Sequence, residues 1–421
     1  MNATTPATLD DPAADRAPRS LWRNRDYLIL WGGQGVSAFG TEASQLALPL
    51  LILAVTHSPA KAGVLGAVRG LAYLCFGLPA GALVDRWDRK RVMLLCDAGR
   101  ALAFATIPLA LALGYLTAAQ LYAVSFVEGT LFVFFGLAET ACLPRVVTRA
   151  QLAAAVAQNQ ATEAAAMLGG PPLGGALFGL GRALPFVADA VSYAASVGSL
   201  LLIRARFQEE RAATPRAMRR EVAAGLRWLW GQPVVRLLMW LSTGVNAVYG
   251  GWALLLIELG QRLGASAATI GLIFAAGGAG TIVGALLAPR LQRRFTVGGI
   301  MVVIAWIFAL TWPPFALVST PLALGVAQFA SFLFVPIYVS THFSYRLVLI
   351  PDALQGRVNS VFRLGTFGGQ TVGFLLTGLL LQWYGPVATV WITFVPSVGL
   401  AALTTLSAGL RRAGRLADVR V

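Results

Sequence analysis

Charged residues are scarce in this chain of 421 residues: 12% are Asp, Glu, Lys or Arg, whereas 57% are hydrophobic. Because soluble globular proteins carry about 25% charged residues, this composition excludes an ordinary soluble domain. The mean hydropathy of +0.70 is instead typical of a chain that crosses a membrane many times. We therefore expect a polytopic membrane protein.

Cysteine and histidine are also rare. The chain has three cysteines and two histidines, and none of them shows the paired spacing of a metal site or a disulfide framework. It has no Gly-rich loop that ends in Lys followed by Ser or Thr, which would hold a nucleotide phosphate, and no nucleophile elbow. These absences exclude an ATP-driven pump acting alone, and we expect no enzymatic activity, no metal and no cofactor.

Acidic residues are few, with 18 against 33 basic ones, which gives a net charge of +15. The basic residues gather in the two ends of the chain and in every second loop, which is the positive-inside pattern. A nucleic-acid-binding protein would instead gather them on one soluble face, and no soluble stretch here is long enough. We expect no nucleic-acid partner, a place in the cell (plasma or inner) membrane with both termini cytoplasmic, and contact between the basic surface and anionic membrane lipids.

Long apolar runs are abundant. A helical span needs about 20 apolar residues, and uninterrupted runs fit helices better than the alternation of barrel strands. We predict an all-α membrane protein with twelve transmembrane helices in two six-helix bundles. The predicted spans are approximately residues 27–54, 62–84, 92–114, 117–141, 160–181, 183–203, 234–259, 268–289, 297–318, 320–345, 359–382 and 386–408.

An internal repeat supports the two bundles. GALVDRWDRKR at 81–91 resembles GALLAPRLQRR at 284–294, and such parallel repeats place a substrate site at the interface between the halves. The segment between the halves carries an amphipathic pattern that is typical of a helix on the membrane surface, although a solvated linker remains an alternative. The expected organisation is a disordered cytoplasmic tail over 1–20, an N-terminal bundle over 21–203, a cytoplasmic linker with an amphipathic helix over 204–233, a C-terminal bundle over 234–410, and a basic cytoplasmic tail over 411–421.

The charged segment Gly81–Arg91 carries a family resemblance. Its pattern resembles motif A of the major facilitator superfamily, Gly-x-Leu-x-Asp-Arg-x-Gly-Arg-Arg, with Asp88 in place of the usual second Gly. That variant resembles the drug:proton antiporter branch, which includes macrolide, tetracycline and enterobactin exporters. The resemblance runs from Asn24 to about Leu406 and implies the major facilitator fold, with a single copy as the working unit. It also rests on NRDYLILWGGQGVSAFG, LPRVVTRAQLAAAVAQNQ, REVAAGLRWLWGQPVVRLL and IPDALQGRVNSVFRLG.

Motif A implies a conformational latch. By this resemblance, Asp85, Arg86 and Arg89 would hold the two bundles together on the cytoplasmic side in the outward-facing state. Asp85 would face the start of the eleventh span, because a helix N-terminus and nearby cations stabilise a carboxylate. Arg91 would pair with Glu139. The alternative is a loop whose charges only set the membrane topology.

Three charged residues are predicted at one depth of the membrane. At 1.5 Å per residue, Glu42, Arg69 and Glu128 lie about 22–24 Å from the cytoplasmic ends of their spans. Charges at such depth are costly and are usually paired or functional. We predict that Arg69 contacts one or both carboxylates and that a proton arriving at Glu42 or Glu128 releases it. The alternative is that Arg69 extends to the outer surface.

A Gly/Pro cluster indicates the direction of transport. GGPPLGG contains Gly170, Pro171, Gly174 and Gly175 and resembles the core of motif C, which is associated with antiporters. This resemblance favours export over import. Helix packing alone is the alternative, since Gly and Pro bend a helix and let its neighbour approach closely.

Polar and aromatic residues at helical spacing are predicted to line a cavity for a bulky molecule. Contact between helices without any ligand explains such spacing equally well. The predicted lining residues are Gln34, Thr41, Gln45, Phe132, Asn246, Tyr249, Trp252, Tyr338, Phe367 and Gln370.

Together these patterns predict a secondary active transporter that exports bulky hydrophobic or amphipathic compounds, such as antibiotics, in exchange for protons by alternating access. Its expected partners are a small-molecule substrate, protons and membrane lipids. Three alternatives remain: an importer or facilitator of a siderophore-like or lipid-like solute, a lipid scramblase, and a non-transporting receptor or scaffold on the same fold.

Overall fold

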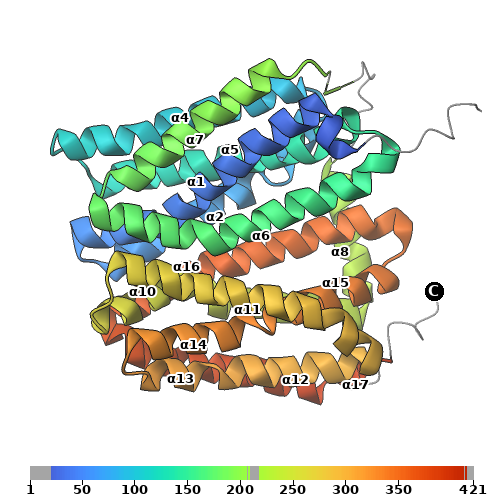
Figure 1. Ribbon diagram of the computed structural model, residues 1–421. Helices are drawn as coiled ribbons and strands as arrows, with labels where there is room; N and C mark the ends of the chain where they lie inside the picture. Colours follow the sequence, from blue (N-terminus) through green and yellow to red (C-terminus); the bar gives the residue numbers. More distant parts are fainter. Residues whose placement is uncertain (1–19, 206, 209–217, 412, 415–421) are drawn as a thin grey trace, which may run out of the picture.

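The computed structural model describes residues 20–205, 207–208, 218–411 and 413–414. Every secondary-structure element in these ranges is a helix, so the predicted all-helical fold is confirmed. Figure 1 shows two layers of roughly parallel helices. The first layer contains α1 (Arg25–Thr56), α2 (Pro59–Phe76), α3 (Pro79–Val84), α4 (Arg89–Ala112), α5 (Ala118–Val146), α6 (Arg149–Leu180) and α7 (Leu184–Leu202), with the 3-10 helix Leu21–Arg23 before them.

The second layer follows a connecting helix, α8 (Met218–Gly231). It contains α9 (Pro233–Tyr249), α10 (Trp252–Arg262), α11 (Ala267–Arg294), α12 (Val297–Leu310), α13 (Trp312–Leu317), α14 (Pro321–Phe332), α15 (Val335–Leu349), α16 (Asp352–Leu406) and α17 (Ala408–Arg411). We call the layers the N-bundle (α1–α7) and the C-bundle (α9–α17).

Nine helical stretches in the described residues are long and apolar enough to cross a membrane. The longest, α16, is two spans, because Gly385 has a φ of +74° that suits glycine and Pro386 follows it. α2 and α6 are absent from the nine, yet they pack lengthwise on spans of both bundles. Counted with these two helices and the break in α16, the structure matches the twelve predicted spans.

Glycine and proline set most of the breaks between collinear helices. α9 and α10 meet at Gly250 and Gly251, and α12 ends just before Pro313. Proline cannot donate the backbone hydrogen bond of a helix interior but fits the first helical turn. These breaks divide single membrane crossings into two shorter helices.

The start of α6 differs from the prediction. The fifth span was predicted to begin near residue 160, where the apolar run begins, whereas α6 begins at Arg149. A capping box starts the helix there: the Thr148 side chain and the Gln151 side chain each bond the other's backbone. Because this signal lies in a polar stretch, hydropathy alone missed it.

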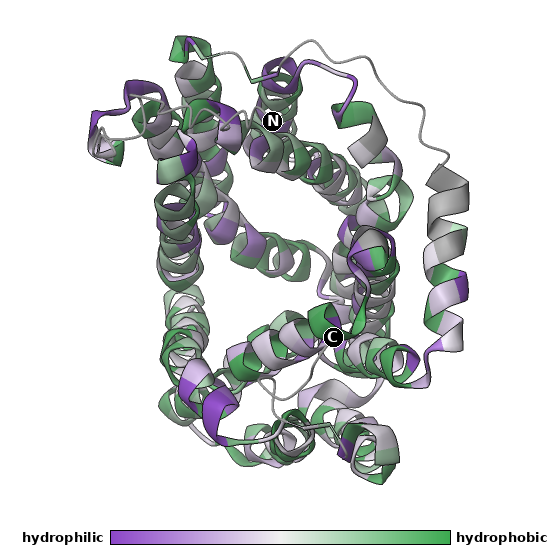
Figure 2. Ribbon diagram, turned by 90° about the vertical axis from the view of Figure 1, so that its right-hand side faces the viewer, coloured by the Kyte–Doolittle hydropathy of each residue, from purple (hydrophilic) through white to green (hydrophobic). Residues whose placement is uncertain are grey.

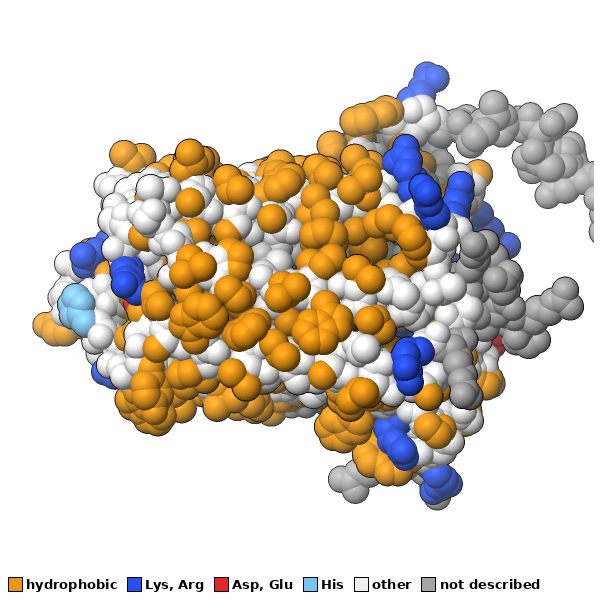
Figure 3. Space-filling view, turned by 90° about the horizontal axis from the view of Figure 1, so that it is seen from below, with side chains coloured by type: hydrophobic (Ala, Val, Ile, Leu, Met, Phe, Trp, Pro, Cys, Tyr) orange, Lys and Arg blue, Asp and Glu red, His pale blue; other side chains and the backbone are white. Residues whose placement is uncertain are grey.

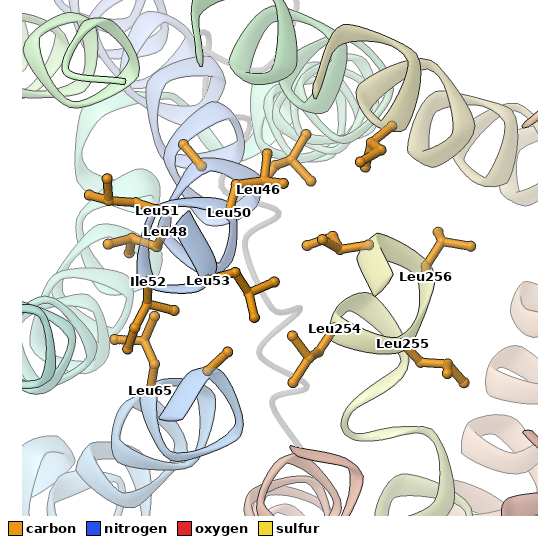
Figure 4. Close-up of a cluster of buried hydrophobic side chains, with 14 of the residues drawn as sticks. Leu46, Leu48, Leu50, Leu51, Ile52, Leu53, Leu65, Leu254, Leu255 and Leu256 are labelled. Carbon is orange, nitrogen blue, oxygen red and sulfur yellow. The ribbon is translucent and has the colours of Figure 1, made fainter. Parts of the chain in front are cut away.

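One end of the molecule carries the start of α1 and the end of α16, and we call it the terminal end; the opposite end is the far end (Figure 1). At the far end a single apolar core joins both bundles. Figure 4 shows Leu46–Leu53 of α1 and Leu65 of α2 on one side of this core and Leu254–Leu256 of α10 on the other. Burying these side chains away from solvent holds the far ends together. We call this core the far-end seal.

The terminal end is organised differently. There each bundle has its own apolar core: one contains Tyr27 and Met93 of the N-bundle, the other Leu238 and Phe362 of the C-bundle. Figure 2 shows the molecule from this end, with the N-bundle above the C-bundle. The bundles are therefore joined at the far end and separate at the terminal end.

Glycines allow the bundles to approach closely in the far half. A Cβ added at Gly63 of α2 would lie 2.6 Å from the Phe374 carbonyl oxygen of α16 and 2.8 Å from the Gly378 Cα. A Cβ added at Gly271 of α11 would lie 2.8 Å from the Pro172 Cα of α6. Small residues are the usual means of close helix packing in membranes.

The connecting helix α8 packs against the start of α16. A Cβ added at Gly225 would lie 3.0 Å from Arg357, and Leu229 is fully buried in the core of the C-bundle. Contact with the membrane surface stays a prediction for this helix. Parts of the predicted linker and both predicted tails, at 1–19, 209–217 and 415–421, lie outside the described residues.

Candidate functional site

A cavity of about 430 Å³ lies between the two bundles. A smaller space of about 180 Å³ shares several of its lining residues and is lined by parts of α1 and α10 that also belong to the far-end seal. The walls combine many aromatic side chains with a smaller number of polar ones, which suits a bulky amphipathic molecule. The aromatic lining residues of the larger space are Tyr73, Phe132, Tyr249, Trp252, Phe274, Phe332, Phe367 and Phe374.

Glu42 and Arg69 line both spaces, and Glu128 lines the smaller one. Arg69 donates to both carboxylate oxygens of Glu128, with Nε 2.7 Å from Oε2 and Nη2 3.3 Å from Oε1. Its Nη1 donates to Gln45 Oε1 at 3.2 Å, and the Gln45 amide lies 3.5 Å from Glu42 Oε1. The structure therefore joins the three predicted residues in one hydrogen-bonded chain, with Arg69 paired inside the protein.

The sequence analysis missed a second buried ion pair. Arg100 Nη1 lies 3.4 Å from Asp97 Oδ1 on the same helix, α4, and the two residues are 4% and 0% exposed. The Ser196 hydroxyl of α7 donates to Asp97 Oδ2 at 2.5 Å. Opposite charges three residues apart inside the apolar span predicted at 92–114 are a helical pairing signal that could have revealed this site.

Phe132 connects the two ion pairs. The Arg69 guanidinium carbon lies 5.4 Å from the centre of its ring, and that of Arg100 lies 5.6 Å from it. Cations are attracted to the face of an aromatic ring at such distances. Because Phe132 is 46% exposed and lines the cavity, a molecule that moves this ring acts on both arginines.

The predicted latch residues lie at the terminal end. Asp85 is 69% exposed, and its carboxylate lies 3.8 Å from Arg89 Nη2. Arg89 Nη1 also donates to the Ala141 carbonyl at 2.9 Å. Asp88, the residue that differs from motif A, caps α4 by accepting a hydrogen bond from the Arg91 backbone at 2.9 Å.

The latch is not closed in this conformation. Arg86 and Arg91 are exposed, and Glu139 is partly buried on α5. Among the described residues, no ion pair joins Arg91 to Glu139 or Asp85 to α16. Since the bundles are separate at the terminal end, the latch between them remains a prediction for the other conformation.

The Gly/Pro cluster lies where α6 contacts both bundles. A Cβ added at Gly170 would lie 3.3 Å from the Ala43 nitrogen of α1, and Gly170 also contacts Glu42. Gly174 packs on the backbone of Ala43. On the other side of α6, Gly175 packs on Ala267 and Pro171 on Gly271, both in α11.

The predicted cavity residues fall into two groups. Helical spacing identifies one face of a helix but does not separate a face toward the cavity from a face toward the bundle interior. Gln45, Phe132, Tyr249, Trp252, Phe367 and Gln370 line the larger space, and Thr41 lines the smaller one. Three lie elsewhere: Gln34 bonds Ser196 inside the N-bundle, Asn246 bonds the Ser242 carbonyl, and Tyr338 packs on Phe308 and His342 inside the C-bundle.

Curated proteins with similar sequences are enterobactin exporters. The exporter of Citrobacter koseri is 28% identical over 381 residues, which covers 87% of this chain and 88% of that protein. The exporter of Shigella dysenteriae serotype 1 is 27% identical over 357 residues, with 82% of each chain covered.

Solved structures share the fold. A bacterial homologue of the human lysosomal transporter Spinster, in an inward-facing and unoccupied conformation, has a TM-score of 0.76 at 14% identity and covers 96% of this chain and 99% of that one. A crystal structure of a variant of the nucleoside transporter NupG has the same TM-score at 14% identity and covers 90% of this chain and 99% of that one. The family described as transmembrane secretion effector matches residues 17–413. The chain therefore belongs to this family of major facilitator transporters, and it is a multi-pass membrane transporter, not an enzyme.

Proposed function

We propose that the chain is a proton-coupled exporter of bulky aromatic or amphipathic molecules. Siderophore-like compounds of the kind that its relatives export are the first candidates, and hydrophobic antibiotics are the second. The observation that carries this proposal is that Arg69 lines an aromatic cavity between the bundles, while its partner Glu128 lines the smaller space that shares part of this wall. Substrate and proton would then act on the same charges.

The orientation follows from the distribution of charge. Figure 3 shows more Lys and Arg side chains near the terminal end than near the far end, with a hydrophobic band between the two ends. Basic residues favour the cytoplasmic side of a membrane. With the terminal end in the cytoplasm, the cavity of this conformation faces the side from which an exporter takes its substrate.

The coupling step uses the buried ion pair. A proton that binds Glu128 removes its negative charge, and Arg69 then loses its bidentate partner. The Arg69 guanidinium still has Gln45 beside it, with Glu42 next along the chain. Because an unpaired charge is costly at membrane depth, protonation shifts the arginine and, through Phe132, the cavity wall.

Alternating access then requires two exchanges of contact. The far-end seal parts, so that the cavity opens to the outside. The terminal ends of the bundles close, and Asp85 meets the N-terminus of α16, where a carboxylate is favourable. The proton supplies the difference in free energy between these two arrangements.

The test is transport in proteoliposomes with an imposed pH gradient, using enterobactin, a macrolide and a cationic dye as probes. We expect accumulation of at least one probe only when the gradient is present. Glu128→Gln removes the titrating group and should lower gradient-driven accumulation about tenfold. Glu258→Gln is the matched control, because Glu258 lies on α10 outside the charge chain. Equal flux with and without the gradient would instead indicate a facilitator or a scramblase.

A further inference from the structure

Three acidic side chains are buried in the described part of the chain: Asp97, Glu128 and Asp189. Asp97 and Glu128 each have an arginine partner. Asp189, on α7, is 0% exposed and has no described cation within the ion-pair distance of 4.0 Å. Since an ionised carboxylate without a counter-charge is costly at membrane depth, Asp189 is placed as a neutral, protonated acid would be.

The surroundings of Asp189 accommodate a proton on one oxygen. The Ser192 hydroxyl lies 3.2 Å from Oδ1, and Oδ2 is buried. Ser44 of α1 lies beside this carboxyl, and its hydroxyl is buried as well. A hydroxyl can accept from a protonated carboxyl and donate to an ionised one. Ser44 can therefore exchange a proton with Asp189 and serve it in both protonation states.

Charged residues of four other helices, α1, α4, α5 and α6, lie around Asp189. On α1 its neighbour is Gly40, where an added Cβ would lie 2.6 Å from Oδ1, and Glu42 of that helix is linked through Gln45 to Arg69. Glu163 of α6 and Glu139 of α5 are close enough to act on each other electrostatically.

Arg100 of α4 is the cation that acts on Asp189, and it is engaged with Asp97, while Glu128 of α5 adds a negative charge. Arg100 Nε and Nη2 have no hydrogen-bond partners. Tyr193, one turn along α7, lies under the Arg100 guanidinium at 5.4 Å and shares a hydrogen bond of 2.9 Å with Thr41. Arg100 therefore holds spare donors for a charged Asp189.

Asp189 is one side chain away from the cavity. Ser44, its neighbour on α1, lines the smaller space together with Thr41, Glu42 and Glu128. A proton that leaves Asp189 through Ser44 therefore reaches the space that the substrate occupies.

We propose that Asp189 is a second proton site of the transporter, one that holds its proton while the terminal end is open and releases it to the cavity through Ser44 when substrate enters. In this step the Oδ2–H bond breaks and the proton passes to Ser44 Oγ, as the Ser44 hydroxyl proton passes to water in the cavity. The spare donors of Arg100 then stabilise the carboxylate. The inference rests on the proposed proton-coupled export.

Infrared spectroscopy of the purified protein at neutral pH tests the resting proton without any substrate. The difference spectrum of wild type minus Asp189→Asn should show the C=O stretch of a protonated carboxyl. Wild type minus Asp97→Asn, the matched control, should lack that band because Asp97 is ion-paired. Ser44→Ala keeps Asp189 and should shift the band, which provides a reading if Asp189→Asn does not fold. A difference spectrum without the band for Asp189→Asn, or a band that Ser44→Ala leaves in place, would overturn the inference.

Transport measurements separate the release step from substrate binding. With enterobactin as the probe, Asp189→Asn should lose about tenfold in gradient-driven accumulation while enterobactin exchange between two equal pH compartments continues. Unchanged gradient-driven accumulation would contradict the role of Asp189. If enterobactin accumulation by the wild type did not depend on the pH gradient, the proposed function would be contradicted. The infrared result would still report whether Asp189 carries a proton.

Discussion

The two guanidinium groups of the N-bundle, Arg69 and Arg100, are held in different ways. Arg69 binds Glu128 through two parallel hydrogen bonds, the geometry that distinguishes arginine from lysine. Arg100 meets Asp97 through a single donor and otherwise lies over aromatic rings. The carboxylate partner therefore fixes the orientation of the Arg69 guanidinium more closely than that of the Arg100 guanidinium.

Arg69→Lys should impair transport although it keeps the charge. An ammonium group cannot make the two-point contact to Glu128 or reach Gln45 at the same time. We expect gradient-driven accumulation to fall about tenfold, measured in proteoliposomes. Arg262→Lys, at the end of α10, is the control and should be close to wild type. Equal activity of Arg69→Lys and wild type would show that the two-point contact has no role.

Phe132→Ala should weaken substrate binding. Loss of the ring removes the contact shared by the two arginines, worth about 0.5–2 kcal/mol for each cation–π pair, and it removes part of the cavity wall. We expect weaker binding of enterobactin by tryptophan fluorescence, with near-normal binding in Phe132→Tyr. If both variants bind as tightly as wild type, Phe132 does not contact the substrate.

Residue-level prediction worked where depth could be counted. The level of Glu42, Arg69 and Glu128 follows from helix rise alone, and the structure places them in one chain of contacts. The sequence analysis missed Asp97, Arg100 and Asp189. Each lies in a strongly apolar span, and a hydropathy average over such a span hides a single charged residue. Asp97 and Arg100 pair on one helix, whereas the neighbours of Asp189 include residues of α1 and α4, so packing was needed to find that site.

At the scale of elements, α6 belongs to the N-bundle and also packs against α11 of the C-bundle. Its Gly174 packs on the backbone of α1 and its Gly175 on the backbone of α11, so a side chain at either position must push a helix away. The polar first half of α6 explains why hydropathy placed its start too late. Helix caps depend on local side chains, and a reading based on apolar runs alone does not include them.

Gly175→Val should weaken the contact between α6 and α11. Overpacking costs about 1–3 kcal/mol, and the cost falls on the conformation that is closed at the far end. We expect greater labelling of a cysteine introduced in the far-end seal, at Leu254. Gly179→Val is the matched control, because an added Cβ there meets nothing within 4 Å. Equal labelling of the two variants would show that the contact between α6 and α11 does not keep the far-end seal closed.

For the whole molecule, the fold and the two halves follow from composition, run length and repeat. The conformation does not, because both arrangements of a rocking transporter use the same helices and differ in which ends meet. The structure shows which ends meet: one apolar core joins the bundles at the far end, and separate cores occupy the terminal end.

Cysteine pairs should report this asymmetry. Ser58 and Gln382 share a hydrogen bond of 2.7 Å between the bundles at the far end, so Ser58→Cys with Gln382→Cys should cross-link without substrate and block transport until it is reduced. Asp85→Cys with Asn359→Cys, at the terminal end, should cross-link only when the protein turns outward. Cys75, Cys96 and Cys142 are first replaced by alanine. Rapid cross-linking of the terminal pair and none of the far pair at rest would contradict the assignment.

Proton-coupled export requires that substrate leaves as protons enter, and simultaneous measurement of both fluxes shows whether it does. Proteoliposomes would contain a pH-sensitive dye, and enterobactin would be added to the side that the terminal end faces. We expect enterobactin movement together with an opposite movement of protons, and loss of both in Glu128→Gln. Enterobactin flux without any change of pH, in wild type, would contradict proton-coupled export.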